Sequence, residues 1–268
     1  MIPIAELSIE ERSSVRFILV DIDDTLTVGG KLPSASYDGL WQLRDRGYIV
    51  IPVTGRPAGW CDMICRQWPV GGVVGENGAF AFHLEGDHLV ATHHPEAPEP
   101  RVNAQRLREI AEEVFESVPG TRWASDQFAR LFDVAIDFRE EEPRLSLADA
   151  ERIKSIFEAH GATAKISSIH VNAWFGSYDK VSMAEIFLYE RFAVDVSHPD
   201  ANRTVLFCGD SPNDEPMFRA FELSVAVANI VEFAPAMRSL PRYVTTQSHA
   251  SGFRELADLL IGRTDSPL

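Results

Sequence analysis

Cysteine, lysine and long apolar runs are all scarce in this sequence. Its 268 residues include 3 cysteines, too few for a disulfide framework, so we expect a reducing, cytoplasmic setting. Cys61 and Cys65 lie one helical turn apart, but no second Cys or His pair near them completes a zinc site. No uninterrupted apolar run of about eighteen residues occurs, so we expect no membrane span. The first twenty residues contain the acids Glu6, Glu10 and Glu11 and no long apolar stretch, so we expect no signal peptide.

Positive charge is also in short supply. Lys and Arg together number 25 against 40 Asp and Glu, which gives a formal net charge of −15. A nucleic-acid or anionic-membrane surface needs a basic patch, so we expect neither nucleic acid nor membrane as a partner. A small anionic substrate is still compatible with this charge if a metal or a few local cations reverse its sign at the site. The oligomeric state is left open.

The pattern of apolar segments divides the chain into three parts. Residues 1–82 alternate buried-strand runs with helices in the order βαβαβ, which predicts a parallel sheet with right-handed crossovers. Residues 83–176 contain a hairpin, two helices and alternating strands, an order typical of an inserted α+β cap domain, and residues 177–268 return to the first pattern. The predicted fold class is α/β, a Rossmann-like doubly wound parallel sheet core with this cap.

Carboxylates cluster where the predicted strands end. In "FILVDIDDT" Asp21 and Asp23 directly follow an apolar run, and alternate residues of extended backbone share a face, so these two point together. Asp210 ends "TVLFCGD", and Asp214 lies one helical turn further on. Because parallel sheets bind ligands at the carboxyl ends of their strands, we expect the four acids to converge there. Such oxygen ligands suit Mg²⁺.

A magnesium ion among spare carboxylates suits phosphoryl transfer. One carboxylate can attack phosphorus, and a second can serve as general acid and base. The second acid needs a raised pKa, which we expect the neighbouring negative charges to supply. The transferred group also needs a hydroxyl and a cation. Thr54, at the carboxyl end of its predicted strand, offers the hydroxyl, and Lys180, at the start of the helix that follows the insertion, offers the cation.

Four short motifs carry a resemblance to a known family. "DIDDT", "VTGR", "SYDK" and "GDSPND", in this order, resemble the motifs of the haloacid dehalogenase (HAD) superfamily. The insertion between the second and third resembles the type-two cap subclass, which includes sucrose-phosphate, trehalose-phosphate and mannosyl-phosphoglycerate phosphatases. The resemblance implies a Mg²⁺-dependent phosphomonoester hydrolase that forms an aspartyl phosphate. The implied substrate is a small phosphorylated metabolite, with a phosphosugar favoured, and Thr54 and Lys180 steady its phosphoryl group.

The resemblance also assigns roles to the four acids. It implies that Asp21 is the nucleophile and a Mg²⁺ ligand, and that Asp23 is the general acid and base and binds the metal through its main-chain carbonyl. Asp210 becomes the second carboxylate ligand. Asp214 belongs to the metal site, where it orients metal-bound waters or Lys180.

Further polar residues are predicted to contact the substrate: Gly55, Arg56, Asn77, His170, Asn172 and Asn213. Alternation along 169–175 places His170, Asn172 and Trp174 on one face of a cap strand, which we expect to be open and to form a sugar platform. The alternative is an ordinary solvent-facing sheet surface.

A second anionic group on the substrate is a further possibility, with Arg122, Arg130 and Lys165 as its candidate partners.

Two other functions are compatible with the same acids. A phosphotransferase or phosphomutase would pass the aspartyl phosphate to a second hydroxyl. A non-catalytic phospho-sensor would have no leaving group to protonate and so no need for Asp23.

Overall fold

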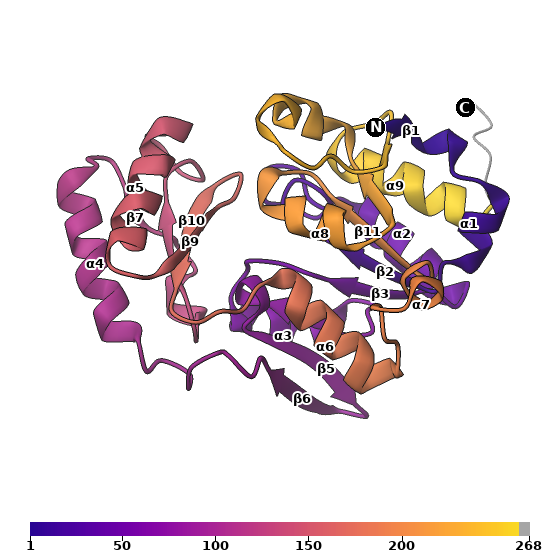
Figure 1. Cartoon of the computed structure of the whole chain (residues 1–268), viewed down its shortest axis with the longest axis horizontal. Helices are drawn as coiled ribbons and strands as arrows, with labels where there is room; N and C mark the ends of the chain where they lie inside the picture. Colours follow the sequence, from indigo (N-terminus) through magenta and orange to yellow (C-terminus); the bar gives the residue numbers. More distant parts are fainter. Residues whose placement is uncertain (263–268) are drawn as a thin grey trace.

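A parallel six-stranded sheet forms the centre of the computed structural model, which describes residues 1–262. Figure 1 shows this core with a second lobe beside it. The strand order is β1 (Ile2–Pro3), β13 (Tyr243–Val244), β12 (Leu223–Ala226), β11 (Val205–Gly209), β2 (Phe17–Val20) and β3 (Ile49–Pro52). All residues of β2 and β11 are buried, as expected for central parallel strands. Because β2 and β11 are paired in parallel, their carboxyl ends lie next to each other.

Helices cover both faces of this sheet. Ile18 and Val20 of β2 pack in one apolar cluster with α2 (Ser34–Asp45) and α9 (His249–Leu260). Phe17 and Leu19 pack in another with α6 (Lys180–Phe192) and α8 (Glu215–Ala220). Each fully buried side chain of this size contributes about 1.5–3 kcal/mol. The doubly wound α/β core predicted from the sequence is confirmed.

Three further helices are α1 (Ile9–Ser14), α3 (Ala58–Gln67) and α7 (Pro199–Asn202), and α3 buries Cys61 and Ile64 in the apolar cluster that contains residues of α2 and α9. Pro57 is the N-cap of α3. The strand β1 and the helix α1 have no counterpart in the sequence prediction. Within residues 1–262 no helix has both the length and the apolar character needed to cross a membrane.

A three-stranded antiparallel sheet extends the core. It consists of β4 (Val73–Gly75), β5 (Phe80–Glu85) and β6 (His88–His93), and one parallel bridge between Val53 and Val74 joins it to the end of β3. The hairpin predicted near residue 86 is present, but it pairs with β4 and not with the cap sheet. The division of the chain into a core (residues 1–82 and 177–268) and an inserted cap (residues 83–176) stays a prediction.

The second lobe is a four-stranded antiparallel sheet with two helices on one face. Its strand order is β7 (Arg122–Trp123), β8 (Val134–Asp137), β10 (His170–Trp174) and β9 (Thr163–Ile166). The helices α4 (Ala104–Ser117) and α5 (Leu147–Ala159) share an apolar cluster with the inward residues of β8 and β10, among them Val171 and Ala173. The alternation along β10 is therefore as predicted.

The opposite face of β10 is not open, and the expectation of a sugar platform on it is wrong. Trp174 is 1% exposed and stacks on Tyr178, with ring centroids 5.5 Å apart. Trp174 belongs to the same apolar cluster as Phe80, which lies in the core, and Phe132, which lies at the junction of core and cap. His170 and Asn172 are buried as well, because this face of the cap lies against the core.

Candidate active site

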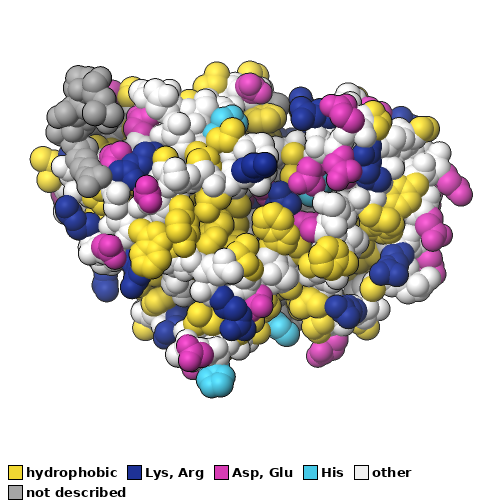
Figure 2. All heavy atoms as spheres, turned by 180° about the vertical axis from the view of Figure 1, so that it is seen from behind, with side chains coloured by type: hydrophobic (Ala, Val, Ile, Leu, Met, Phe, Trp, Pro, Cys, Tyr) yellow, Lys and Arg dark blue, Asp and Glu magenta, His cyan; other side chains and the backbone are white. Residues whose placement is uncertain are grey.

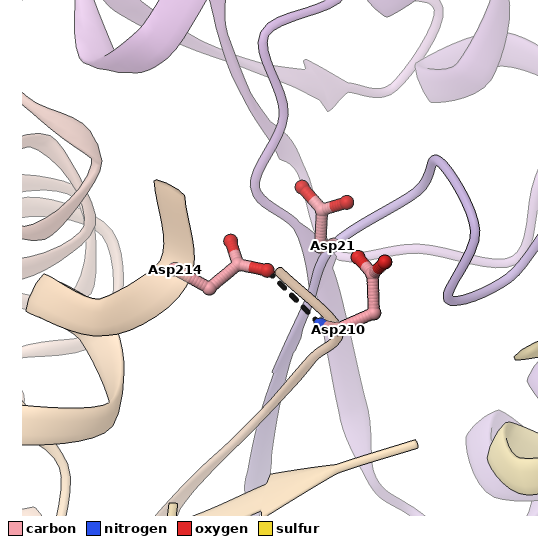
Figure 3. Close-up of side chains that lie close together, drawn as sticks. All are labelled: Asp21, Asp210 and Asp214. Atoms are coloured by element: carbon pink, nitrogen blue, oxygen red, sulfur yellow. Dashed lines mark hydrogen bonds between the residues drawn. The ribbon is translucent and has the colours of Figure 1, made fainter. Parts of the chain in front are cut away.

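Three buried carboxylates meet at the carboxyl ends of β2 and β11. Asp21 follows β2, and Asp210 follows β11, which is the parallel neighbour of β2. Asp214 comes from the short turn before α8. One oxygen atom from each of the three carboxylates lies within 4.8 Å of the others (Figure 3). The convergence predicted from the sequence is thus present for these three acids.

Lys180 provides the cation between them. It is the first residue of α6, whose N-cap Asp179 forms a capping box with Ser182. Its Nζ lies 2.7 Å from Oδ1 of Asp21 and 2.9 Å from Oδ1 of Asp214. Burial works against the charged ammonium, but these two carboxylates raise the pKa of Lys180 above its usual range.

One ammonium does not balance three carboxylates. Burial raises the pKa of Asp21 to about 8, with further contributions from Asp214 and Asp23 and against the attraction of Lys180. Burial, together with Asp214 and Asp21, also raises the pKa of Asp210 well above its usual value. Such perturbed carboxyls are typical of a site that is completed by another positive charge.

The donor set fits a hard divalent cation. Asp214 is already engaged, because its Oδ1 accepts from Lys180 and its Oδ2 from the backbone N–H groups of Asp210 and Ser211, the former drawn in Figure 3. Asp21 and Asp210 keep carboxylate lone pairs available. All of these ligands are oxygens, the type that Mg²⁺ prefers. The metal-ligand roles of Asp23 and Asp214 stay predictions.

Thr54 and Gly55 form the adjacent turn after β3. Thr54 is buried, and its Oγ1 accepts a 3.0 Å hydrogen bond from the backbone N–H of Arg56. A Cβ atom at position 55 would lie 3.0 Å from Oδ1 of Asn77, so the tight packing here favours glycine. The amide of Asn77 in turn donates to Oδ2 of Asp133, at 3.2 Å.

Asp23 is held by an arginine. Nε of Arg56 lies 2.9 Å from one Asp23 oxygen, and Nη2 lies 2.7 Å from the other, a bidentate pair. Nη1 of Arg56 also donates to Asp126 at 3.1 Å, and a carboxylate oxygen of Glu140 lies 3.6 Å from Nη2. Asp126 and Glu140 belong to the cap. From the sequence we expect negative charges next to Asp23, whereas its contact here is with a guanidinium that also connects core and cap.

The six residues predicted to contact substrate all line one small cavity between core and cap. Its volume is about 20 Å³, and Asp21, Asp23 and Arg130 also border it. His170 lies 2.8 Å from Glu140 through Nε2, Asn172 donates to Asp133 at 3.0 Å, and Asn213 accepts from Ser211 at 2.6 Å. The cavity is therefore surrounded by polar groups that already have protein partners.

A larger cavity opens beside the small one. It has a volume of about 320 Å³, which is within the range for small-molecule sites, and it shares Asp23 and Ser168 with the small cavity. Asp210 and Asn229 line it from the core, and Arg139 lines it from the cap. A substrate whose phosphoryl group lay at Asp21 could extend in this direction.

The candidate partners of a second anion are placed differently from one another. Arg130 is buried between Asp133 and Asp126, 2.8 and 3.3 Å away. Arg122 lies 3.5 Å from Glu141, and Lys165 stands exposed on β9. Neither Arg122 nor Lys165 lines either of the two cavities described above.

A buried network of hydrogen bonds around Glu76 and Arg130 lies behind this site and was not predicted from the sequence. Glu76 is fully buried and accepts backbone N–H groups from Ala58 and from the cap segment 131–133. Arg130 donates to both Asp133 and the carbonyl of Gly55. The acids at 76 and 133 were visible in the sequence, but nothing local indicated that core and cap would bury them against each other.

Comparisons with known proteins show what this chain is similar to. Residues 18–114 match the family model of haloacid dehalogenase-like hydrolases. No curated protein matches the chain. The resemblance predicted from the four motifs is confirmed, and with it the prediction of an enzyme of this type.

Solved structures share the fold over nearly the whole chain. The C-terminal domain of trehalose-6-phosphate phosphatase from C. albicans is 15% identical, with a TM-score of 0.69 and 95% of each chain covered. The sucrose-phosphatase of Synechocystis sp. PCC6803, solved with sucrose and phosphate, is 18% identical, with a TM-score of 0.61 and coverage of 91% of this chain and 97% of its own. A Thermoplasma acidophilum protein is 17% identical, with a TM-score of 0.68 and coverage of 92% and 98%. At these identities the similarity establishes the fold.

Proposed function

We propose that this chain, a haloacid dehalogenase-like hydrolase by family match and fold, is a Mg²⁺-dependent phosphomonoester hydrolase. Its substrate would be a small phosphorylated metabolite, and a sugar phosphate is the class we favour. The observation that carries the proposal is the contact of Lys180 with Asp21 and Asp214, beside Asp210, at the ends of two central parallel strands.

The residues divide the reaction into two steps. A carboxylate oxygen of Asp21 forms a bond to phosphorus while the ester P–O bond breaks, and Asp23 delivers a proton to the departing oxygen. Asp23 then takes a proton from water, whose oxygen attacks phosphorus and releases inorganic phosphate and the Asp21 carboxylate. Lys180 and Thr54 hold the phosphoryl oxygens. Mg²⁺, held by Asp21 and Asp210, would offset the negative charge of the phosphoryl group.

The substrate class rests on two supports. The larger cavity, of about 320 Å³, has room for a leaving group of monosaccharide or disaccharide size next to the small phosphoryl cavity. Two proteins of the same fold carry names that specify sugar phosphates, trehalose 6-phosphate in one case and a sucrose phosphatase bound to sucrose and phosphate in the other.

A screen for released phosphate tests the proposal. The protein is incubated with a panel of phosphorylated metabolites in the presence and absence of Mg²⁺. Asp21→Asn removes the nucleophilic oxygen's charge with little change of shape, so it should lower turnover by at least about 1,000-fold. Asp200→Asn, at a carboxylate fully exposed on α7, is the matched control and should keep wild-type turnover.

The outcomes separate the competing functions. Phosphate release that depends on Mg²⁺ and on Asp21 supports a hydrolase. Transfer of the phosphoryl group to a second hydroxyl without release would identify a phosphotransferase or mutase. A phosphorylated Asp21 that forms from a small phosphodonor but never turns over would identify a sensor, and wild-type turnover in Asp21→Asn would show that the nucleophile is another residue.

A further inference from the structure

Asn229 lies beside the proposed metal ligand without belonging to any of the four motifs. It is in the 3-10 turn Ala228–Glu232, which follows β12, and β12 is the sheet neighbour of β11. Its Nδ2 donates to Oδ2 of Asp210 at 3.1 Å and to the carbonyl of Asp24 at 3.2 Å. Its Oδ1 accepts the backbone N–H of His249 at 2.9 Å. One amide thus joins the segments after β2, β11 and β12 and the start of α9.

The three contacts fix which way this amide faces. If its oxygen and nitrogen were exchanged, the oxygen would face the Asp210 carboxylate and the Asp24 carbonyl, and the NH₂ group would face the N–H of His249. All three contacts would then be repulsive, so the orientation follows from the bonding pattern.

Asp210 is oriented from both sides. Oδ1 accepts from Oγ1 of the buried Thr25 at 3.2 Å, and Oδ2 accepts from Asn229. A carboxylate oxygen has two lone pairs, so each oxygen keeps one for a cation. The carboxylates of Asp21 and Asp214 lie close by and repel Asp210, and Thr25 and Asn229 offset this repulsion by hydrogen bonds, in addition to the attraction of the Lys180 ammonium.

The backbone around Asn229 also depends on it. Asp24 and His249 both have left-handed φ values, 57° and 52°, which residues other than glycine seldom adopt. The carbonyl of Asp24 accepts from Asn229 and contacts Nδ1 of His249 at 2.9 Å. The bonds of Asn229 are therefore among those that hold these two residues in an otherwise uncommon conformation.

We propose that Asn229 is a positioning residue that fixes the side chain of Asp210 for Mg²⁺, and so sets the affinity of the site for the metal. The proposal rests on the proposed function, since it requires that Asp21 and Asp210 bind the ion. Asn229 acts through Asp210 and needs no contact with the reacting atoms. Partners that orient a metal ligand in this way commonly account for 10- to 100-fold of metal affinity.

Calorimetric titration of Mg²⁺ into the protein, with no substrate present, tests this role. Asn229→Ala removes both donors and should weaken Mg²⁺ binding by roughly 10- to 100-fold. Asn229→Leu keeps the branched side-chain shape of asparagine but has no donor, and it should show the same loss if the alanine variant does not fold. Circular dichroism confirms that each titrated variant is folded.

Asn202 offers a matched control. Its amide also makes three bonds, to the carbonyls of Val196 and Ala220 and from the N–H of Glu222, but it precedes β11 and so lies at the opposite edge of the sheet. Asn202→Ala should lose a similar number of hydrogen bonds and keep the wild-type Mg²⁺ affinity.

The possible results are distinct. A loss in the Asn229 variants alone supports the positioning role. Affinity within about twofold of wild type in those variants, or an equal loss in Asn202→Ala, overturns it while leaving the proposed function in place. A wild-type protein that neither binds Mg²⁺ nor releases phosphate overturns the proposed function, and this inference with it.

Discussion

At the scale of single residues, the site depends on a balance of buried charges. Of the four lysines in the chain, Lys180 is the one whose ammonium lies between Asp21 and Asp214. Removal of one partner from such a buried group leaves an uncompensated charge, which typically costs about 3–5 kcal/mol. Three carboxylates against one ammonium leave two negative charges for a divalent cation to balance.

This balance predicts a pH dependence of metal binding. Burial raises the pKa of Asp21 to about 8 in the metal-free protein, so below this pH Mg²⁺ must displace a proton. The ionisation of Asp21 should therefore make Mg²⁺ affinity rise between about pH 6 and pH 8, by up to roughly tenfold per unit. Calorimetric titrations at these pH values measure the effect, and a constant affinity would contradict it.

The stability of the metal-free protein should follow the opposite trend. The pKa of Asp21 is about 8 in the folded state against an ordinary value of 3.8, so the folded protein binds more protons than the unfolded chain between these values. The contribution of Asp21 to stability is fully present below the unfolded pKa and is lost as pH rises through the folded one.

At the scale of elements, one buried glutamate joins core and cap. The Glu76 carboxylate accepts the N–H of Ala58, at the start of α3, at 3.0 Å. It also accepts those of Leu131, Phe132 and Asp133, which lead into β8, at 2.9, 2.6 and 3.2 Å. Four backbone donors are satisfied by one side chain, so the cap segment is fixed next to Asn77 and the Thr54 turn.

Replacement of this carboxylate tests its role. Glu76→Gln puts an NH₂ group where an oxygen accepted N–H donors, so it should lower the free energy of unfolding by about 2–4 kcal/mol. Hydrogen exchange of the amides at 131–133 should become faster. Chemical denaturation and exchange measure the two effects, with Glu10→Gln on the exposed face of α1 as the control. Unchanged exchange at 131–133 would show that other contacts hold the cap.

At the scale of the whole molecule, the cap buries the site while the surface keeps a mixed charge. Figure 2 shows one face, on which acidic and basic side chains of the described residues are interspersed without a broad basic patch. The net charge is −15, and Asp21, Asp210 and Asp214 are buried within the fold. These acids come together only in the folded protein, so metal binding should stabilise the folded state of the entire protein.

A thermal melt measures this stabilisation. Mg²⁺ at about 100 times its Kd should add about 2.7 kcal/mol, or roughly 5–10 °C in Tm for a chain of this size. Asp210→Asn should abolish that shift. Without metal the same variant should be at least as stable as wild type, because it removes one of the mutually repelling buried charges. A Mg²⁺ shift that persists in Asp210→Asn would place the ion elsewhere.

Particular residues show where prediction from sequence stopped. The runs that became β2, β3 and β11 were recognisable, because parallel strands covered by helices are apolar on both faces. The alternation along β10 was also recognisable, but the prediction for Trp174 was wrong, since a polar-looking strand face does not reveal whether another domain covers it. Asn229 gave no signal, because its role depends on the adjacency of β11 and β12.

The sequence alone determined the α/β core, the order of the motifs along the chain and the identity of the acids at the strand ends. These features follow from local periodicity and short motifs. Only the tertiary structure decided that Arg56 pairs with Asp23, that Glu76 anchors the cap and that Asn229 supports Asp210. These contacts join residues from separate segments, and burial removes the water that would otherwise satisfy them. No local sequence pattern indicates which distant group replaces that water as a hydrogen-bond partner.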